Sequence, residues 1–324
     1  MQFHARRSLI SPVLLGTASA MAIAPSRAEA STTTSIIWTM TAPGLALASA
    51  GGVDDGDGPP ATIKLTGIVR DFHERSVSGG HPDFERPPNA GFGHYIMNID
   101  PALGADGKPK FTGGGRRVTG NFRDASNRNI CWTLYDPSRG DKAAALGAVD
   151  NGGITSAESF EEWYTDVPGV NLSEPLTLTL VRQSDGTYVF DDRDDPMYSS
   201  LGGFFPINER LFGNSAGNMT RNFHFTFELR TTFTYNASAN QVFEFRGDDD
   251  VWVFIDNQLV IDIGGVHGAI TQAVELDRLG LTDGEEYSLM FFFAERHRTQ
   301  SNFRFTTNFE LKSLPPIGTT LAFD

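Results

Sequence analysis

The chain has 324 residues, of which 40% are hydrophobic and 20% are charged, and its formal net charge at pH 7 is −14. This composition is typical of a globular protein and argues against a disordered one. The acidic excess argues against a nucleic-acid partner, because an acidic surface repels phosphates. Cys131 is the only cysteine, so an internal disulfide is excluded.

The first thirty residues have the pattern of an export signal. A pair of arginines precedes an interrupted apolar stretch near residues 9–24, and Ala28 and Ala30 have the A-x-A spacing of a cleavage site. We expect cleavage near Ala30 and a mature protein that is secreted, either extracellular or periplasmic, with no membrane span. A membrane anchor is the competing interpretation of the same stretch.

The next segments alternate between linker, strand and loop patterns. Residues 31–61 are rich in Ser, Thr, Ala and Gly and are expected to form a flexible linker. Residues 62–72 alternate between apolar and polar side chains, which predicts a strand. Residues 73–160 are rich in turn-forming residues and are expected to form long inserted loops.

Short elements follow the loops. Ser156 is placed to cap a short helix over residues 156–164. Residues 175–182 and 187–190 are expected to be strands on either side of a QSDG turn.

From residue 220 onward the β pattern is nearly continuous. Residues 221–235 and 241–247 alternate cleanly, and residues 251–263 predict a hairpin that turns at Asp256-Asn257. Residues 286–296 and 301–311 are expected to form a second hairpin.

Hairpins of this kind build antiparallel sheets that pack face to face. We therefore predict an all-β fold, an antiparallel β-sandwich with long inserted loops and a few short helices. Its core is expected mostly within residues 220–313, and residues 314–324 are a C-terminal tail.

Three consecutive aspartates, Asp248, Asp249 and Asp250, stand between two apolar runs. Calcium takes six to eight oxygen ligands, and a short acidic loop supplies several of them. The alternative is a solvated turn, on which screened charges interact only weakly. Gly247 before the triplet and the apolar residues after it favour a site that is supported by a rigid strand.

Four separated motifs resemble the fibro-slime domain family, in the order expected for it. They lie at residues 65–85, 204–214, 247–268 and 279–305, and the resemblance spans about residues 62–313. This family is similar to the protective-antigen-like, jelly-roll-like sugar-binding sandwiches of adhesins. The resemblance implies a secreted or surface protein that binds carbohydrate or belongs to a slime-like extracellular matrix.

The resemblance also implies a calcium site. In the sugar-binding relatives an Asp-Asp pair joined by a cis peptide holds calcium, which chelates vicinal sugar hydroxyls. The match falls on Asp248 and Asp249, whereas Asp250 stands where the relatives have glycine. A second loop normally completes the site, and Glu295 and Asn302 offer oxygens from such a loop. The alternatives are a salt bridge between Glu295 and a neighbouring arginine and a turn capped by Asn302.

We thus expect calcium to be the cofactor, with five candidate ligands: Asp248, Asp249, Asp250, Glu295 and Asn302. Candidates for contact with the glycan are Trp252, His267, His297, Arg298 and Gln300. The alternative for Trp252 is a core residue, since a strand tryptophan is more often buried. The alternative for His267 is a structural or solvated residue, which is the more common role of a lone histidine in a glycine-rich loop. Asp262 is expected at the far end of the sandwich, roughly 20 Å away, because about six strand residues separate it from the triplet.

Three functions are compatible with these residues. The first is a non-catalytic, calcium-dependent carbohydrate-binding or adhesion module whose partner is a glycan or polysaccharide. The second is a structural matrix or surface adhesin component with a purely structural calcium, which has other cell-surface or matrix proteins as partners. The third is a glycoside hydrolase, for which Asp249 and Glu295 would have to flank the bond about 5–9.5 Å apart. We favour the first.

Overall fold

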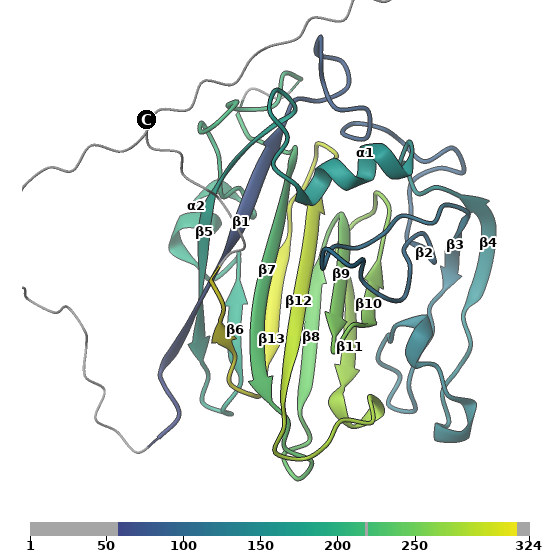
Figure 1. The fold of residues 1–324 in the computed structure, drawn as a ribbon, viewed down its shortest axis with the longest axis vertical. Coiled ribbons are helices and arrows are strands. Elements are labelled where there is room, and N and C mark those ends of the chain that lie inside the picture. Colours follow the sequence, from purple (N-terminus) through teal and green to yellow (C-terminus); the bar gives the residue numbers. More distant parts are fainter. Residues whose placement is uncertain (1–57, 218–219, 316–324) are drawn as a thin grey trace, which may run out of the picture. The chain divides into compact units, whose positions relative to one another are not determined.

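The computed structural model describes residues 58–217 and 220–315. The expected signal peptide, nearly all of the expected linker and most of the C-terminal tail lie outside the described residues. In the described part, eleven strands form one antiparallel sheet in the order β10-β9-β12-β7-β1-β5-β6-β13-β8-β11, with β14 paired to β7 (Figure 1). These strands are β1 (Thr62–Phe72), β5 (Asn171–Arg182), β6 (Tyr188–Asp191), β7 (Phe225–Thr234), β8 (Val242–Gly247), β9 (Asp250–Ile255), β10 (Gln258–Ile263), β11 (Ile270–Glu275), β12 (Glu286–Glu295), β13 (Phe303–Thr307) and β14 (Lys312–Ser313).

The long sheet folds over itself into two facing layers. Phe291 of β12 lies 5.2 Å from Phe245 of β8 and 5.5 Å from Phe303 of β13, measured between ring centroids. The two end strands also meet. The Asp262 amide of β10 donates to Gln272 Oε1 of β11 at 3.0 Å, and Gln272 Nε2 donates to the Asp262 carbonyl at 3.0 Å. The all-β antiparallel sandwich predicted from the sequence is confirmed, in a form that is nearly closed at this edge.

Several local predictions are confirmed. Strand β1 has the predicted bounds, and Ser156 caps helix α1 (Ala157–Glu161), which continues into the 3-10 turn η3 (Glu162–Tyr164). The hairpin of β9 and β10 turns at Asp256 and Asn257, which have φ values of 49° and 62°. The other helical elements are α2 (Pro196–Leu201), η1 (Trp132–Leu134), η2 (Pro137–Arg139) and η4 (Leu276–Arg278).

The second predicted hairpin is wrong. Strand β12 pairs with β7 and β9, whereas β13 pairs with β6 and β8, so the two strands lie in opposite layers. Both strands alternate as hairpin strands do, but their inner phenylalanines contact each other edge-on across the core. The segment that joins them, residues 296–302, therefore crosses from one layer to the other.

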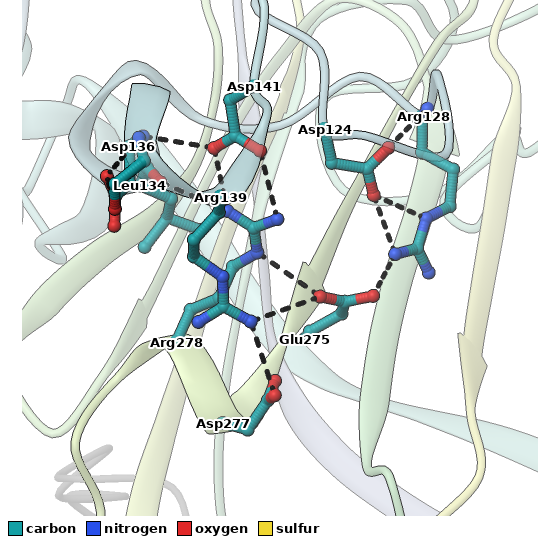
Figure 2. A network of polar contacts seen from close by, with 10 residues as sticks. Asp124, Arg128, Leu134, Asp136, Arg139, Asp141, Glu275, Asp277 and Arg278 are labelled. Carbon is teal, nitrogen blue, oxygen red and sulfur yellow. Dashed lines mark hydrogen bonds and ion pairs between the residues drawn. The ribbon is translucent and has the colours of Figure 1, made fainter.

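The inserted loops contain a small sheet in the order β2 (Tyr95–Ile96), β3 (Gly115–Gly120) and β4 (Ala145–Asp150), which lies beside β10 (Figure 1). A network of ion pairs fastens another part of the insert to the end of β11 (Figure 2). In it Arg128 pairs with Asp124 and Glu275, and Arg278 pairs with Asp141 at 2.8 Å and with Glu275 at 3.3 Å. The insert is thus held against the sandwich.

Helix α1 lies across the layer that contains β9 and β12 (Figure 1), and turn η3 follows it directly in the chain. Phe292 of β12 packs edge-on against Tyr164 at 5.0 Å, and Trp252 of β9 packs edge-on against Phe160 at 5.4 Å. This second apolar layer explains why three consecutive phenylalanines in β12 are all buried. No helix among the described residues has the length and apolar character needed to cross a membrane.

Candidate functional site

The aspartate triplet lies where the chain passes between the two layers. Strand β8 ends at Gly247 in one layer and β9 begins at Asp250 in the other. The peptide bond between Asp248 and Asp249 is cis. The three aspartates are no more than 3% exposed, and the apolar strand β9 follows at once. The acids are therefore buried and rigidly anchored.

Asp250 forms a buried ion pair. Its Oδ2 lies 2.5 Å from Arg296 Nε, and neither side chain is exposed to solvent. Its Oδ1 accepts a hydrogen bond from the Gly265 amide at 2.6 Å. Arg296 also donates to the Gly152 carbonyl at 2.9 Å and lies 4.9 Å above the Trp163 ring. Asp250 therefore serves as the counter-ion of Arg296, and, unlike Asp248 and Asp249, it does not line the pocket described below. The expectation that it is a cation ligand is corrected.

Asp248 and Asp249 accept hydrogen bonds from the segment that crosses between the layers. The Asn302 amide donates to Asp248 Oδ1 at 2.6 Å, and Asn302 Nδ2 donates to Asp248 Oδ2 at 2.9 Å. The two oxygens of Asp249 accept from the backbone amides of His267, at 3.1 Å, and Arg296, at 3.2 Å. Main-chain donors thus fix both carboxylates.

Glu295, the last residue of β12, is fully buried. Its Oε1 accepts from the His297 amide at 3.4 Å, whereas its Oε2 is buried and has no hydrogen-bond partner in the ranges that the structure describes. Among the described residues it forms no ion pair with Arg296 or Arg298. The salt-bridge alternative for Glu295 is therefore wrong, and an oxygen remains buried without a donor.

Burial disfavours the charged form of the acids at this junction. Burial raises the pKa of Asp248 to about 6, in spite of the hydrogen bonds from Asn302. Burial also raises the pKa of Asp249 well above its ordinary value, and Asp250 and Asp248 add to this effect. The pKa of Glu295 rises for the same reason, with Asp249 and Asp248 as its charged neighbours. The nearby Arg296 is already paired with Asp250, so the group favours either protons or a bound cation.

A pocket of about 310 Å³ opens beside Asp248 and Asp249. The predicted contact residues His267, His297 and Gln300 line this pocket together with the two aspartates. The remaining lining residues are Phe92, Val266, Gly268 and Thr299.

Phe92 was missed by the sequence interpretation. It lies in the inserted loops, far from the triplet along the chain, and no local pattern indicates that the two meet.

His267 presents a neutral imidazole. Burial lowers its pKa to about 3, so the ring is uncharged at neutral pH. Its Nδ1 lies 3.0 Å from the Gly268 carbonyl, which can only accept, so Nδ1 carries the proton. Nε2 is buried and has no hydrogen-bond partner within the described residues.

Two of the predicted contact residues do not line the pocket. Trp252 is fully buried, and its Nε1 donates to Asp262 Oδ1 at 3.1 Å, so it is a core residue. Arg298 turns toward the acids of the inserted loops, with Nε 2.9 Å from Glu85 and Nη1 3.4 Å from Glu74. Both predictions of direct ligand contact are corrected. Arg298 instead anchors the segment that carries His297 and Gln300.

Asp262 is not at the far end of the sandwich. The hairpin returns antiparallel, so Asp262 pairs in register with Trp252, two residues from Asp250. Its Oδ2 accepts from Trp132 Nε1 and from the Met97 amide, both at 2.9 Å. About six strand residues separate Asp262 from the triplet along the chain, but the antiparallel return of β10 brings it back beside the start of β9. Asp262 ties the insert to β10.

The residues around Asp248 and Asp249 fit a calcium ion. The two carboxylates and the unpaired Glu295 Oε2 are hard oxygen donors, the donor type that calcium prefers. Asn302 instead presents its Nδ2 to Asp248, and its Oδ1 accepts from Arg193 Nη2 at 3.1 Å, so its predicted role as a cation ligand is corrected. Among the described residues, however, the three acidic or histidine ligand atoms that converge within 4.8 Å belong to Glu74, Glu85 and His224, against which Arg298 lies. Asp248 and Asp249 thus supply a partial set of ligands, and a bound ion would need oxygens from elsewhere.

The fold and the pocket define an all-β sandwich with a carboxylate-lined pocket at one edge. Residues 207–321 match the PA14 domain. The chain is also similar to psi proteins of Dictyostelium discoideum. It is 35% identical to psiD over 216 residues, which cover 65% of this chain and 35% of psiD. It is 37% identical to psiR over 257 residues, which cover 78% of this chain and 22% of psiR.

The chain thus spans about a third of the length of psiD and less of psiR. Among solved structures it is similar to the PA14 domain of the MpAFP antifreeze protein, with a TM-score of 0.20 and 11% identity. That similarity covers 28% of this chain and 45% of the other. The PA14 match includes β7 to β13 and therefore the aspartate triplet.

Proposed function

We propose that this chain is a non-catalytic carbohydrate-binding and adhesion module of the fibro-slime type. Its pocket binds glycan through a calcium ion that Asp248 and Asp249 hold. The observation that carries this proposal is the pair of buried aspartates that line an open pocket and that, within the described part of the chain, form no ion pair with a basic side chain. The match to the PA14 domain, a carbohydrate-binding and adhesion type of module, supports it.

Each side chain has a defined task in this proposal. Asn302 orients Asp248, while the His267 and Arg296 amides orient Asp249. Glu295 adds negative charge behind the two aspartates. A bound calcium ion supplies coordination positions that vicinal sugar hydroxyls can fill in place of water. Gln300 and Thr299 at the pocket wall provide hydrogen bonds to the remaining hydroxyls.

Glycosidase activity is disfavoured by the arrangement of the acids. A glycosidase needs one protonated and one ionised carboxyl group on opposite sides of the bond. Among the residues that line the pocket, the carboxylates are the adjacent Asp248 and Asp249, and Glu295 is not among them. The proposed partners are a glycan or polysaccharide and the matrix or cell surface that carries it. The export pattern of the N-terminus supports a location outside the cytoplasm.

Binding to a glycan array tests this function. Wild type, D249N and D256N are compared in calcium and in chelator, where Asp256 is an exposed acid in the β9-β10 turn and serves as the matched control. We expect wild type and D256N to bind only in calcium and D249N to lose at least tenfold in affinity. Binding by wild type that survives the chelator would remove calcium from the mechanism.

A purely structural calcium is the second candidate. The hydrogen bonds from Asn302 and Arg296 to the aspartates join the β8-β9 junction to the segment between β12 and β13, so an ion there would stiffen the sandwich. In that case calcium would raise the melting temperature, and no glycan on the array would bind.

A further inference from the structure

Phe92 is an exposed aromatic residue in a rigid frame. Its side chain is 52% exposed, and the other large apolar residues exposed in the described ranges are aliphatic: Val149, Leu172, Val181 and Met197. Single exposed apolar residues are common and need no explanation. Phe92 differs from the others because it lines the same pocket as Asp248 and Asp249.

The backbone around Phe92 is fixed on both sides. Tyr95 Oη donates to the Gly91 carbonyl at 2.7 Å, and Arg117 Nη2 donates to the Phe92 carbonyl at 2.7 Å. The Gly93 amide donates to the Val266 carbonyl at 2.8 Å, which joins this segment to the loop that carries His267. Gly93 has a φ of 156°, and a Cβ there would meet Arg117 Nε at 2.9 Å. These hydrogen bonds restrict the backbone of the loop, so the position of the Phe92 ring at the pocket is fixed.

The ring itself is held by its neighbour. Its centroid lies 4.9 Å from that of His297, with the two planes at 68°. An edge contact of this kind supports the ring and leaves much of it open to the pocket. Holding a side chain in place before binding lowers the entropy that a ligand must overcome.

The pocket thus combines two kinds of binding group, carboxylates and an aromatic ring. Its floor has carboxylates that suit a cation and a vicinal diol, and its rim has an aromatic ring that suits an apolar surface. A pyranose ring has both a face of C–H groups and an edge of vicinal hydroxyls. An acyclic polyol has the hydroxyls without the rigid apolar face.

We propose that Phe92 is a stacking platform that makes the pocket selective for pyranose sugars over acyclic polyols. This inference rests on the proposed function, because it needs the diol to be held at Asp248 and Asp249. The specificity then comes from the inserted loops, whereas the cation ligands come from the sandwich.

Titration calorimetry in calcium tests the proposal with the methyl pyranosides of galactose, glucose and mannose and with sorbitol. The variants are F92A, F92Y, which keeps an aromatic ring, and the control M197A, which removes an exposed side chain elsewhere. We expect F92A to bind the best pyranoside about tenfold more weakly and sorbitol within twofold of wild type. F92Y and M197A should bind both as wild type does.

The shift in melting temperature that calcium causes separates the two possible failures. If F92A keeps that shift and also keeps wild-type affinity for the pyranoside, the role of Phe92 is overturned while the proposed function stands. If wild type binds none of the four probes in calcium, the proposed function and this inference both fail.

Discussion

The Arg296 guanidinium and the Asp250 carboxylate form an ion pair that is closed to solvent on both sides, with 2.5 Å between Nε and Oδ2. Arg296 directly follows β12, and Asp250 is the first residue of β9. The pair therefore locks the two ends of neighbouring strands at the edge where the pocket opens. It also explains the third aspartate, which balances a buried cation, while its two predecessors line the pocket.

Replacing Arg296 by methionine should destabilise the protein by about 3–5 kcal/mol, because Asp250 is left as a buried charge without its partner. Denaturant unfolding at pH 7 measures this change. K312M is the control, since Lys312 pairs with Glu286 at a site where both side chains are more than half exposed. The control should change stability by less than about 1 kcal/mol. A decrease of less than about 1 kcal/mol in the free energy of unfolding of R296M would show that the ion pair does not stabilise this edge of the sandwich.

Replacing Trp252 by phenylalanine should lower stability by about 1–3 kcal/mol, because Asp262 loses a buried donor and the core loses volume. Glycan affinity should stay within twofold of wild type, since the indole does not line the pocket. Thermal unfolding and calorimetry check the two parts separately. If W252F folds normally but loses glycan binding, Trp252 contacts the ligand and the assignment of this residue to the core alone is wrong.

Asp71 should make stability fall as the pH rises. Its oxygens accept from the Phe212 amide and from Asn222 Nδ2, both at 2.8 Å, but burial raises its pKa from 3.8 to about 7. The folded state therefore holds this proton more tightly than the unfolded state between about pH 4 and 7. The contribution of Asp71 is largest below pH 4 and declines through that window, by up to about 4 kcal/mol.

The variant D71N isolates this effect, because its side chain does not titrate. Stability measured against pH should decline less steeply between pH 4 and 7 in D71N than in wild type. If the free energy of unfolding declines equally steeply with pH in D71N and in wild type between pH 4 and 7, the Asp71 carboxyl group does not bind a proton in this window.

The sequence predicted features that depend on neighbouring residues. Alternation placed β1 correctly, Ser156 marked the start of α1, and Asp256-Asn257 marked the turn between β9 and β10. In each case the physical cause lies within a few residues: side-chain periodicity, an N-cap oxygen, or residues that tolerate positive φ.

The errors concern contacts between distant segments. Strands β12 and β13 carry inner phenylalanines that suit a hairpin and facing layers equally well, so the pattern could not choose between them. Asp250 looks like its two neighbours in the sequence, and only the packing of Arg296 distinguishes it. Phe92 reaches the pocket through the Gly93 contact with Val266, which no local pattern indicates.

Direct calcium titration of the protein by calorimetry, with D248N, D249N and D256N alongside, tests the central claim most directly. The account predicts one calcium ion per chain for wild type and D256N and a loss of at least tenfold in affinity for D248N and D249N. If wild type takes up no calcium, or if D249N takes it up as wild type does, the two aspartates do not form a cation site.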